Sequence, residues 1–260
     1  MSRFAVLGIA TLCLFMVSGC ASTPEVAQRG TPDFLGAVTV VDQSEEYEPT
    51  KRHEVLHLLA EEVAMDAAQY VGRIRASKNV DVATIDEIMS ALQATALRMG
   101  GNAFRVEQLT CASDTPTVAA ELKVFEVPES LLEENEEHFP KNRVYLFGAL
   151  HPEADSTTFS VNDQKVVVGP LRYVTNLNSK EGKTTIDATG LFGESLTLKR
   201  LEGRPSSYWS RSAFAMSPYA SVQANTDAVR GIDANTNELY PVNDQLGRVL
   251  VRVLNEQRAP

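Results

Sequence analysis

The sequence predicts an α+β protein in which a small α+β sandwich module is followed by an antiparallel all-β sandwich module. Three observations predict this class. A helical pattern over 84–99 precedes two strand patterns, an order typical of compact α+β units. After residue 141, short apolar segments recur about every ten residues, which is the rhythm of a sandwich. An acidic stretch over 128–141 separates the two patterns and is expected to be the interdomain linker.

Residues 1–19 have the pattern of an export signal. One cation, Arg3, precedes an apolar run over 4–17, which is too short to span ~30 Å of hydrocarbon as a permanent helix. The run ends in Val17-Ser18-Gly19-Cys20, which resembles the lipobox of bacterial lipoprotein precursors. The resemblance implies cleavage before Cys20, whose thiol takes a diacylglycerol, and anchoring by acyl chains such as palmitate. The competing interpretation is an ordinary secretory signal that happens to contain a cysteine.

The net negative charge of the chain limits the kinds of partner that it can bind by electrostatic attraction. The chain has 24 Lys and Arg against 34 Asp and Glu, and loss of Arg3 with the signal lowers the net charge from −10 to about −11. An acidic chain does not attract phosphates, so we expect no nucleic-acid partner and no electrostatic adhesion of the chain to anionic lipid. In the family that the signal resembles, Asp after the cysteine retains the protein at the inner membrane. Ala21 and Ser22 stand there instead, which favours the outer membrane, in either leaflet.

The cysteines exclude an internal disulfide in the mature chain. Cys13 leaves with the signal and Cys20 is the lipidation site, so Cys111 remains alone. Two interpretations of Cys111 stay open: a small buried apolar residue, or a site for a bridge to another chain. Burial must therefore stabilise the fold, and a mature chain of about 240 residues is long enough for one large or two modest domains.

The first module is expected over 35–127, after a flexible tether. The tether, residues 20–34, is rich in polar residues, Pro and Gly and has no apolar period. Apolar residues at three- and four-residue spacing predict a helix over 55–67, and an alternating pattern predicts a strand over 70–76.

The helix over 84–99 has the clearest ends in the sequence. Thr84 and Glu87 form a capping-box pattern at its start, and Gly100-Gly101 supply the left-handed conformation that ends it. Further strands are predicted over 37–41, 102–110 and 117–127.

Residues 94–106 contain the corner Gly100-Gly101-Asn102-Ala103 and resemble the A-x-x-x-G-[GA]-N-[AT]-V stretch of small envelope lipoproteins that include the stress sensor RcsF. The resemblance extends over about residues 69–127. It implies the fold of the first module and, by analogy, a sensing role. The chain departs from the sensor at Cys111, because disulfides hold the sensor and Cys111 has no partner here.

The second module is expected over 142–256. Strands are predicted over 144–147, 159–161, 165–168, 171–174, 184–189, 195–201, 208–214 and 246–254, with Asn162-Asp163 as a hairpin turn. Trp209 either fills the core or stacks a sugar on an exposed face. The polar segment 216–242 is expected to be a long loop, and loops on a rigid sandwich can carry a ligand site.

One motif has catalytic potential: His53-Glu54-Val55-Leu56-His57, an H-E-x-x-H sequence. On a helix, His53 and His57 share a face and could hold zinc, while Glu54 would activate the bound water. Candidate third ligands, none within a family motif, are Glu61, Asp86 and Glu87. The interpretation that we favour is a surface helix whose histidines flank the apolar stripe.

These features predict a lipid-anchored protein of the bacterial outer membrane that acts as a binding or interaction module, with a sensing or structural role. Its expected partners are the membrane, through the lipid on Cys20, and another envelope protein. This interpretation assigns no reaction, catalytic residue, metal or cofactor. The alternative is a zinc-dependent hydrolase with His53 and His57 as ligands and Glu54 as the catalytic residue.

Overall fold

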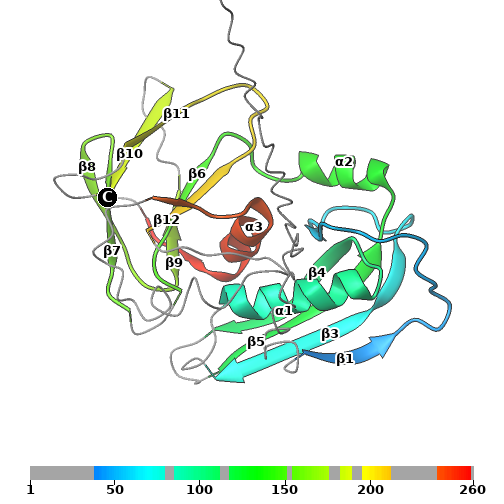
Figure 1. The fold of residues 1–260 in the computed structure, drawn as a ribbon. Coiled ribbons are helices and arrows are strands. Elements are labelled where there is room, and N and C mark those ends of the chain that lie inside the picture. Colours follow the sequence, from blue (N-terminus) through cyan, green and yellow to red (C-terminus); the bar gives the residue numbers. More distant parts are fainter. Residues whose placement is uncertain are drawn as a thin grey trace, which may run out of the picture. The chain divides into compact units, whose positions relative to one another are not determined.

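The computed structural model describes residues 38–79, 85–111, 117–150, 154–175, 182–188, 195–211 and 239–258. In these residues three helices and fourteen strands form an α+β fold with mixed and antiparallel sheets (Figure 1). The predicted α+β class is therefore confirmed. The lipobox with Cys20, the tether, Thr84 and most of the 216–242 segment lie outside the described residues, as does the side chain of Cys111. Within the described part, no helix is long and apolar enough to cross a membrane.

The first half contains a five-stranded sheet with the order β1-β3-β5-β4-β2. Neighbouring strands are antiparallel except β2, which runs parallel to β4. The strands predicted over 37–41, 70–76, 102–110 and 117–127 are confirmed. The five strands are β1 (Val38–Gln43), β2 (His57–Leu58), β3 (Gln69–Asn79), β4 (Ala103–Cys111) and β5 (Thr117–Glu126).

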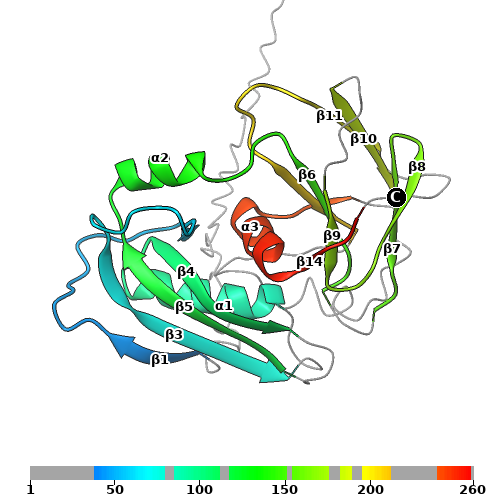
Figure 2. The same ribbon diagram turned by 180° about the vertical axis from the view of Figure 1, so that it is seen from behind.

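Helix α1 (Ile85–Arg98) contacts β1, β3 and β5 and lies across one face of this sheet, as Figure 2 shows. The helix ends as predicted, because Gly100 has a φ of 94°, a left-handed conformation that favours glycine. The Tyr47 hydroxyl donates to the carbonyl of Gly100 at 2.8 Å.

The corner after α1 is tightly built. A Cβ atom on Gly101 would lie 2.2 Å from Val124 Cγ1, so the close packing of the chain on β5 requires glycine. The buried Asn102 side chain donates to the Val127 carbonyl at 2.9 Å and accepts from the Val127 amide at 2.8 Å. These contacts give the Gly-Gly-Asn corner a structural role in this chain.

The second half contains two further sheets. One is antiparallel, with the order β11-β10-β7-β8, and the other is mixed, with the order β13-β12-β6-β9-β14. Asn162 and Asp163 have positive φ angles and join β7 to β8, which confirms the predicted hairpin turn. The strands are β6 (Val144–Phe147), β7 (Thr157–Val161), β8 (Gln164–Val168), β9 (Arg172–Val174), β10 (Lys183–Ala188), β11 (Ser195–Lys199), β12 (Ser207–Ser210), β13 (Tyr240–Pro241) and β14 (Asn255–Glu256).

Strand β6 lies between two hydrophobic cores. All four of its residues are buried. Val144 and Leu146 belong to the core that β6 shares with β7, β8 and β10. Tyr145 and Phe147 belong to a different core, which also contains residues of helix α3. A strand covered on both faces has a continuous apolar sequence instead of an alternating one.

The strand predicted over 246–254 is wrong, because these residues form helix α3 (Asp244–Val253). The Asn243 side chain accepts from the amides of Gln245 and Leu246 and so caps the helix start. Parallel pairing of β12 with β6 and of β14 with β9 also makes the sheet mixed. The second half is therefore not the antiparallel all-β module that the sequence predicts.

The acidic stretch over 128–141, expected to be a linker, contains helix α2 (Glu129–Glu137). Its Asn135 is fully buried. One core cluster contains apolar residues from both halves, among them Ile88 and Leu92 of α1 and Leu246 and Val249 of α3. The boundary between two independent modules stays a prediction, and this shared core makes us expect the halves to unfold together.

Candidate functional site

The helix predicted over 55–67 is wrong, so the H-E-x-x-H motif is not helical. Leu56 and Leu58 belong to one core cluster and Leu59 to another, while Val55 is 48% exposed. The apolar residues of this segment recur at three- and four-residue spacing because they pack into two different cores, and not because they share one face of a helix. The helical face on which His53 and His57 could share a zinc ion does not exist.

The three motif residues have different surroundings. His53 Nε2 lies 3.4 Å from Glu126 Oε1, which also accepts from the Thr50 hydroxyl at 3.1 Å. Glu54 is exposed, and His57 is half-buried on β2. Within the described residues, no group of three or more His, Cys, Asp or Glu side chains is placed to hold a metal ion.

His57, the last residue of the motif, lies on β2, at a junction where β2 meets α2 and α3. One edge of β2 pairs with β4, and side chains from the two helices cover the other edge. Leu58 donates its amide to Gln245 Oε1 at 2.8 Å and accepts from Asn135 Nδ2 at 3.0 Å. The Ala60 amide donates to Asn135 Oδ1 at 2.8 Å. Because Asn135 and Gln245 are both buried, these bonds satisfy backbone groups that water cannot reach.

Arg248 of α3 is the centre of this junction, with only 6% of its side chain exposed. It donates to the two Glu136 carboxylate oxygens at 2.7 and 2.6 Å, and to Asp244 one turn earlier at 2.7 Å. Its guanidinium carbon lies 3.9 Å from the centroid of the Phe139 ring, so a cation–π contact adds to the ion pairs. We call Arg248, Glu136, Asp244 and the neighbouring His57 the Arg248 cluster.

Burial and charge change the pKa values of this cluster. Arg248 lowers the pKa of Glu136 through its hydrogen bonds. Desolvation raises the pKa of Asp244 and lowers that of His57, so the imidazole is neutral at pH 7. Titratable groups whose pKa values move in opposite directions beside a cleft mark a candidate functional site.

A cleft of about 320 Å³ lies beside the Arg248 cluster. Its lining includes the aromatic residues Phe139, Tyr145 and Tyr208, where the two tyrosine rings are stacked with centroids 5.2 Å apart. Glu61 and Arg252, which form an ion pair, line it as well. The Nε atom of Arg248 is buried and has no hydrogen-bond partner among the described residues. An apolar and aromatic cleft with a few fixed charged groups has the composition of a binding site.

No protein-family model, no curated protein and no solved structure matches this chain.

The sequence singles out His57 of the Arg248 cluster, but Arg248 itself was missed because a strand was predicted where α3 lies. A helical signal was present: Asn243 and Asp244 stand at the start, Arg252 stands in the last turn, and apolar residues recur at helical spacing. The partners were not predictable from a motif, because 112 positions separate Arg248 from Glu136. Trp209, by contrast, packs partly buried against the sandwich core, as one of its two interpretations states.

Proposed function

We propose that this chain is a lipid-anchored protein of the bacterial outer membrane that binds another envelope protein. The anchoring part rests on the sequence Val17-Ser18-Gly19-Cys20. The binding part rests on one observation, the cleft beside the Arg248 cluster.

The cleft fits a protein partner better than a small apolar ligand. Glu61 and Glu62 give its rim negative charge, whereas Arg252 adds a cation. Mixed charge around buried aromatic residues resembles the polar rim and apolar centre of protein interfaces.

Anchoring is tested by labelling cells with radioactive or clickable palmitate. The wild-type chain should incorporate label and fractionate with outer membranes, whereas Cys20→Ala should remain an unlabelled precursor because it lacks the acceptor thiol. Equal labelling of the two chains would contradict the lipid anchor.

Binding is tested by photo-crosslinking in intact cells. A photoreactive residue introduced at Glu62, in the cleft, should give one discrete adduct with an envelope protein. The control is the same residue at Glu46, which is exposed in a turn outside the cleft and should give none. The adduct should weaken when Arg252→Glu reverses a charge of the cleft. Adducts of equal yield from both positions, or none from Glu62, would exclude the cleft as the binding site.

A further inference from the structure

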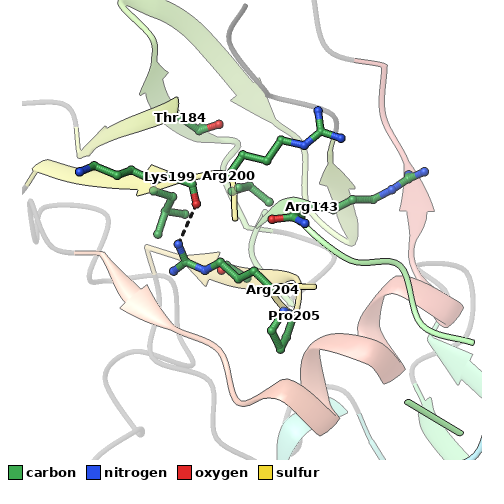
Figure 3. Close-up of a pocket in the computed structure, with 10 residues that line it drawn as sticks. Arg143, Thr184, Lys199, Arg200, Arg204 and Pro205 are labelled. Carbon is green, nitrogen blue, oxygen red and sulfur yellow. Dashed lines mark hydrogen bonds between the residues drawn. The ribbon is translucent and has the colours of Figure 1, made fainter. Parts of the chain in front are cut away.

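A second charged region is lined by residues of the four-stranded sheet and of the mixed sheet, and it shares no residue with the Arg248 cluster. Arg143, Lys199, Arg200 and Arg204 line one small hollow together with Asn142, Thr184 and Ser207 (Figure 3). No carboxylate is among its lining residues. We call these four cations the basic face. It is notable in a chain whose net charge is −10.

Among the described residues, the four cations of the basic face have no acidic partner, in contrast to several cations elsewhere on the surface. Other surface cations, such as Arg73, Arg75, Lys123 and Arg252, form ion pairs. Within the described part of the chain, none of the four basic-face side chains has a carboxylate within ion-pair distance. Their charge is therefore available to an external anion.

The backbone beneath the basic face is held in place. The Arg200 amide donates to the Gly182 carbonyl at 2.7 Å, and the Asn142 amide donates to the Arg204 carbonyl at 2.8 Å. Asn142 Oδ1 accepts from the Leu201 amide at 3.0 Å. These bonds connect β10, β11 and the segment before β6, so the cations are presented by an ordered surface.

The directions of the side chains decide what kind of anion fits. Figure 3 shows Lys199 extending to one side and Arg200 and Arg143 extending to the other, while Arg204 Nη1 donates to the Lys199 carbonyl at 2.9 Å. A single phosphate would contact one or two of these groups. A surface with many phosphates would contact all of them, and an anionic lipid bilayer is such a surface.

We propose that the basic face binds the phosphate groups of an anionic lipid surface and so orients the folded chain on the membrane. The proposal rests on the proposed function in one respect, because the lipid on Cys20 would keep the chain near the bilayer. An anchored chain stays at the bilayer, where the local concentration of lipid is high, so even a weak affinity suffices.

The net charge of −10 predicts no adhesion of the chain as a whole to anionic lipid, and the proposal departs from that expectation because the four cations are local. The opposition of net and local charge gives the proposal a distinctive salt dependence. At 0.01 M salt the screening length is about 30 Å, so the bilayer interacts with the whole acidic chain and repels it. At 0.1 M it is about 10 Å, and the cations that contact the bilayer dominate. At 1 M it is about 3 Å and the attraction is lost. Binding should therefore be strongest at intermediate salt.

The test uses the unlipidated chain of residues 21–260, which contains the compact unit Pro32–Pro260, so it does not depend on the anchor. Sedimentation with vesicles is measured for phosphatidylcholine alone and for its mixture with phosphatidylglycerol. We expect binding to the anionic vesicles only. Each cation removed should lower it about fivefold, so Lys199→Gln with Arg200→Gln should lower it roughly 25-fold.

The matched control is Lys51→Gln with Arg52→Gln, which removes an equally exposed adjacent pair and changes the net charge equally. It should leave binding within about twofold. Equal losses in both variants would show that only net charge matters and would overturn the proposal. So would binding to neutral vesicles, or competition by millimolar inorganic phosphate at constant ionic strength, which would indicate a single-phosphate site. If vesicles bind but Cys20→Ala still incorporates palmitate in cells, the proposed anchor fails and the basic face stands.

Discussion

Replacement of Arg248 by methionine tests whether the Arg248 cluster holds α2 and α3 together. Removal of one partner from a fully buried ion pair costs about 3–5 kcal/mol, whereas an exposed pair contributes about 0–1 kcal/mol. Arg248 is 6% exposed, but Glu136 and Asp244 are 44% and 43% exposed, so water can solvate the carboxylates left behind. We therefore expect Arg248→Met to lower the free energy of unfolding by about 2–3 kcal/mol.

Arg252→Met is the matched control on the same helix. Arg252 is 29% exposed and its partner Glu61 is 73% exposed, so this change should cost within about 0.5 kcal/mol. Urea unfolding measures both variants. For a domain of this size, the melting temperature of Arg248→Met should fall by about 5–10 °C.

The pH dependence gives a second readout. The pKa of Glu136 is lowered in the folded chain, so its contribution to stability is present above its unfolded pKa, near 4.5, and is lost as pH falls through the folded value. The raised pKa of Asp244 acts in the opposite direction, since its buried charge costs stability above its unfolded pKa. Without Arg248 both carboxylates gain from protonation. The stability difference between wild type and Arg248→Met should thus be largest near neutral pH and shrink below about pH 4.

The same unfolding curves test the division into modules. Trp209, the single tryptophan, lies on β12 in the second half, so its fluorescence reports that half, whereas circular dichroism reports all three helices. The shared core predicts coincident transitions. Equal destabilisation by Arg248→Met and Arg252→Met, or a difference that does not change with pH, would refute the role given to the cluster. Separate transitions would show independent modules.

Two further predictions concern the sequence motifs. Purified protein should contain far less than one zinc ion per chain, and a chelator should leave its melting temperature unchanged, because His53 and His57 are not on a common helical face. Stoichiometric zinc that disappears in His53→Ala with His57→Ala would instead support the hydrolase. Gly101→Ala should cost about 1–3 kcal/mol in urea unfolding through the contact with Val124, whereas Gly169→Ala, whose added Cβ would lie 3.4 Å from its nearest neighbour, should cost less.

The elements predicted correctly are those whose local signals agree with their tertiary surroundings. Helix α1 has a strong stop signal at Gly100, and β7 and β8 are joined by two residues that tolerate a positive φ. Strand β6 was predicted from its short run of four apolar residues, because such a run is stable only when it is buried. In each case neighbours along the chain determine the structure.

The two wrong elements fail for different physical reasons. Residues 55–67 have a helical period, yet the amides of His57 and Leu59 donate to the carbonyls of Asn102 and Phe104 on a neighbouring segment. Sheet pairing with a distant strand therefore overrides the local period. Residues 246–254 are rich in Val and Leu and look like a strand. Their helix depends on Asn243 as a cap and on a buried stripe that includes Leu246 and Val249.

The acidic stretch shows why composition alone gave an incomplete interpretation of residues 128–141. Its glutamates suggest a solvated linker, and most of them are exposed on α2. Two polar residues attach the helix to the fold by hydrogen bonds: Asn135, which completes the edge of β2, and Glu136, which pairs with Arg248. A linker would leave both side chains in water. Because each makes specific bonds with a segment 75 or more positions away, the stretch is part of the junction that forms the cleft. A partner that fills the cleft would contact α3, the segment after β2 and the segment that directly follows α2, so binding there would stabilise the junction as a whole.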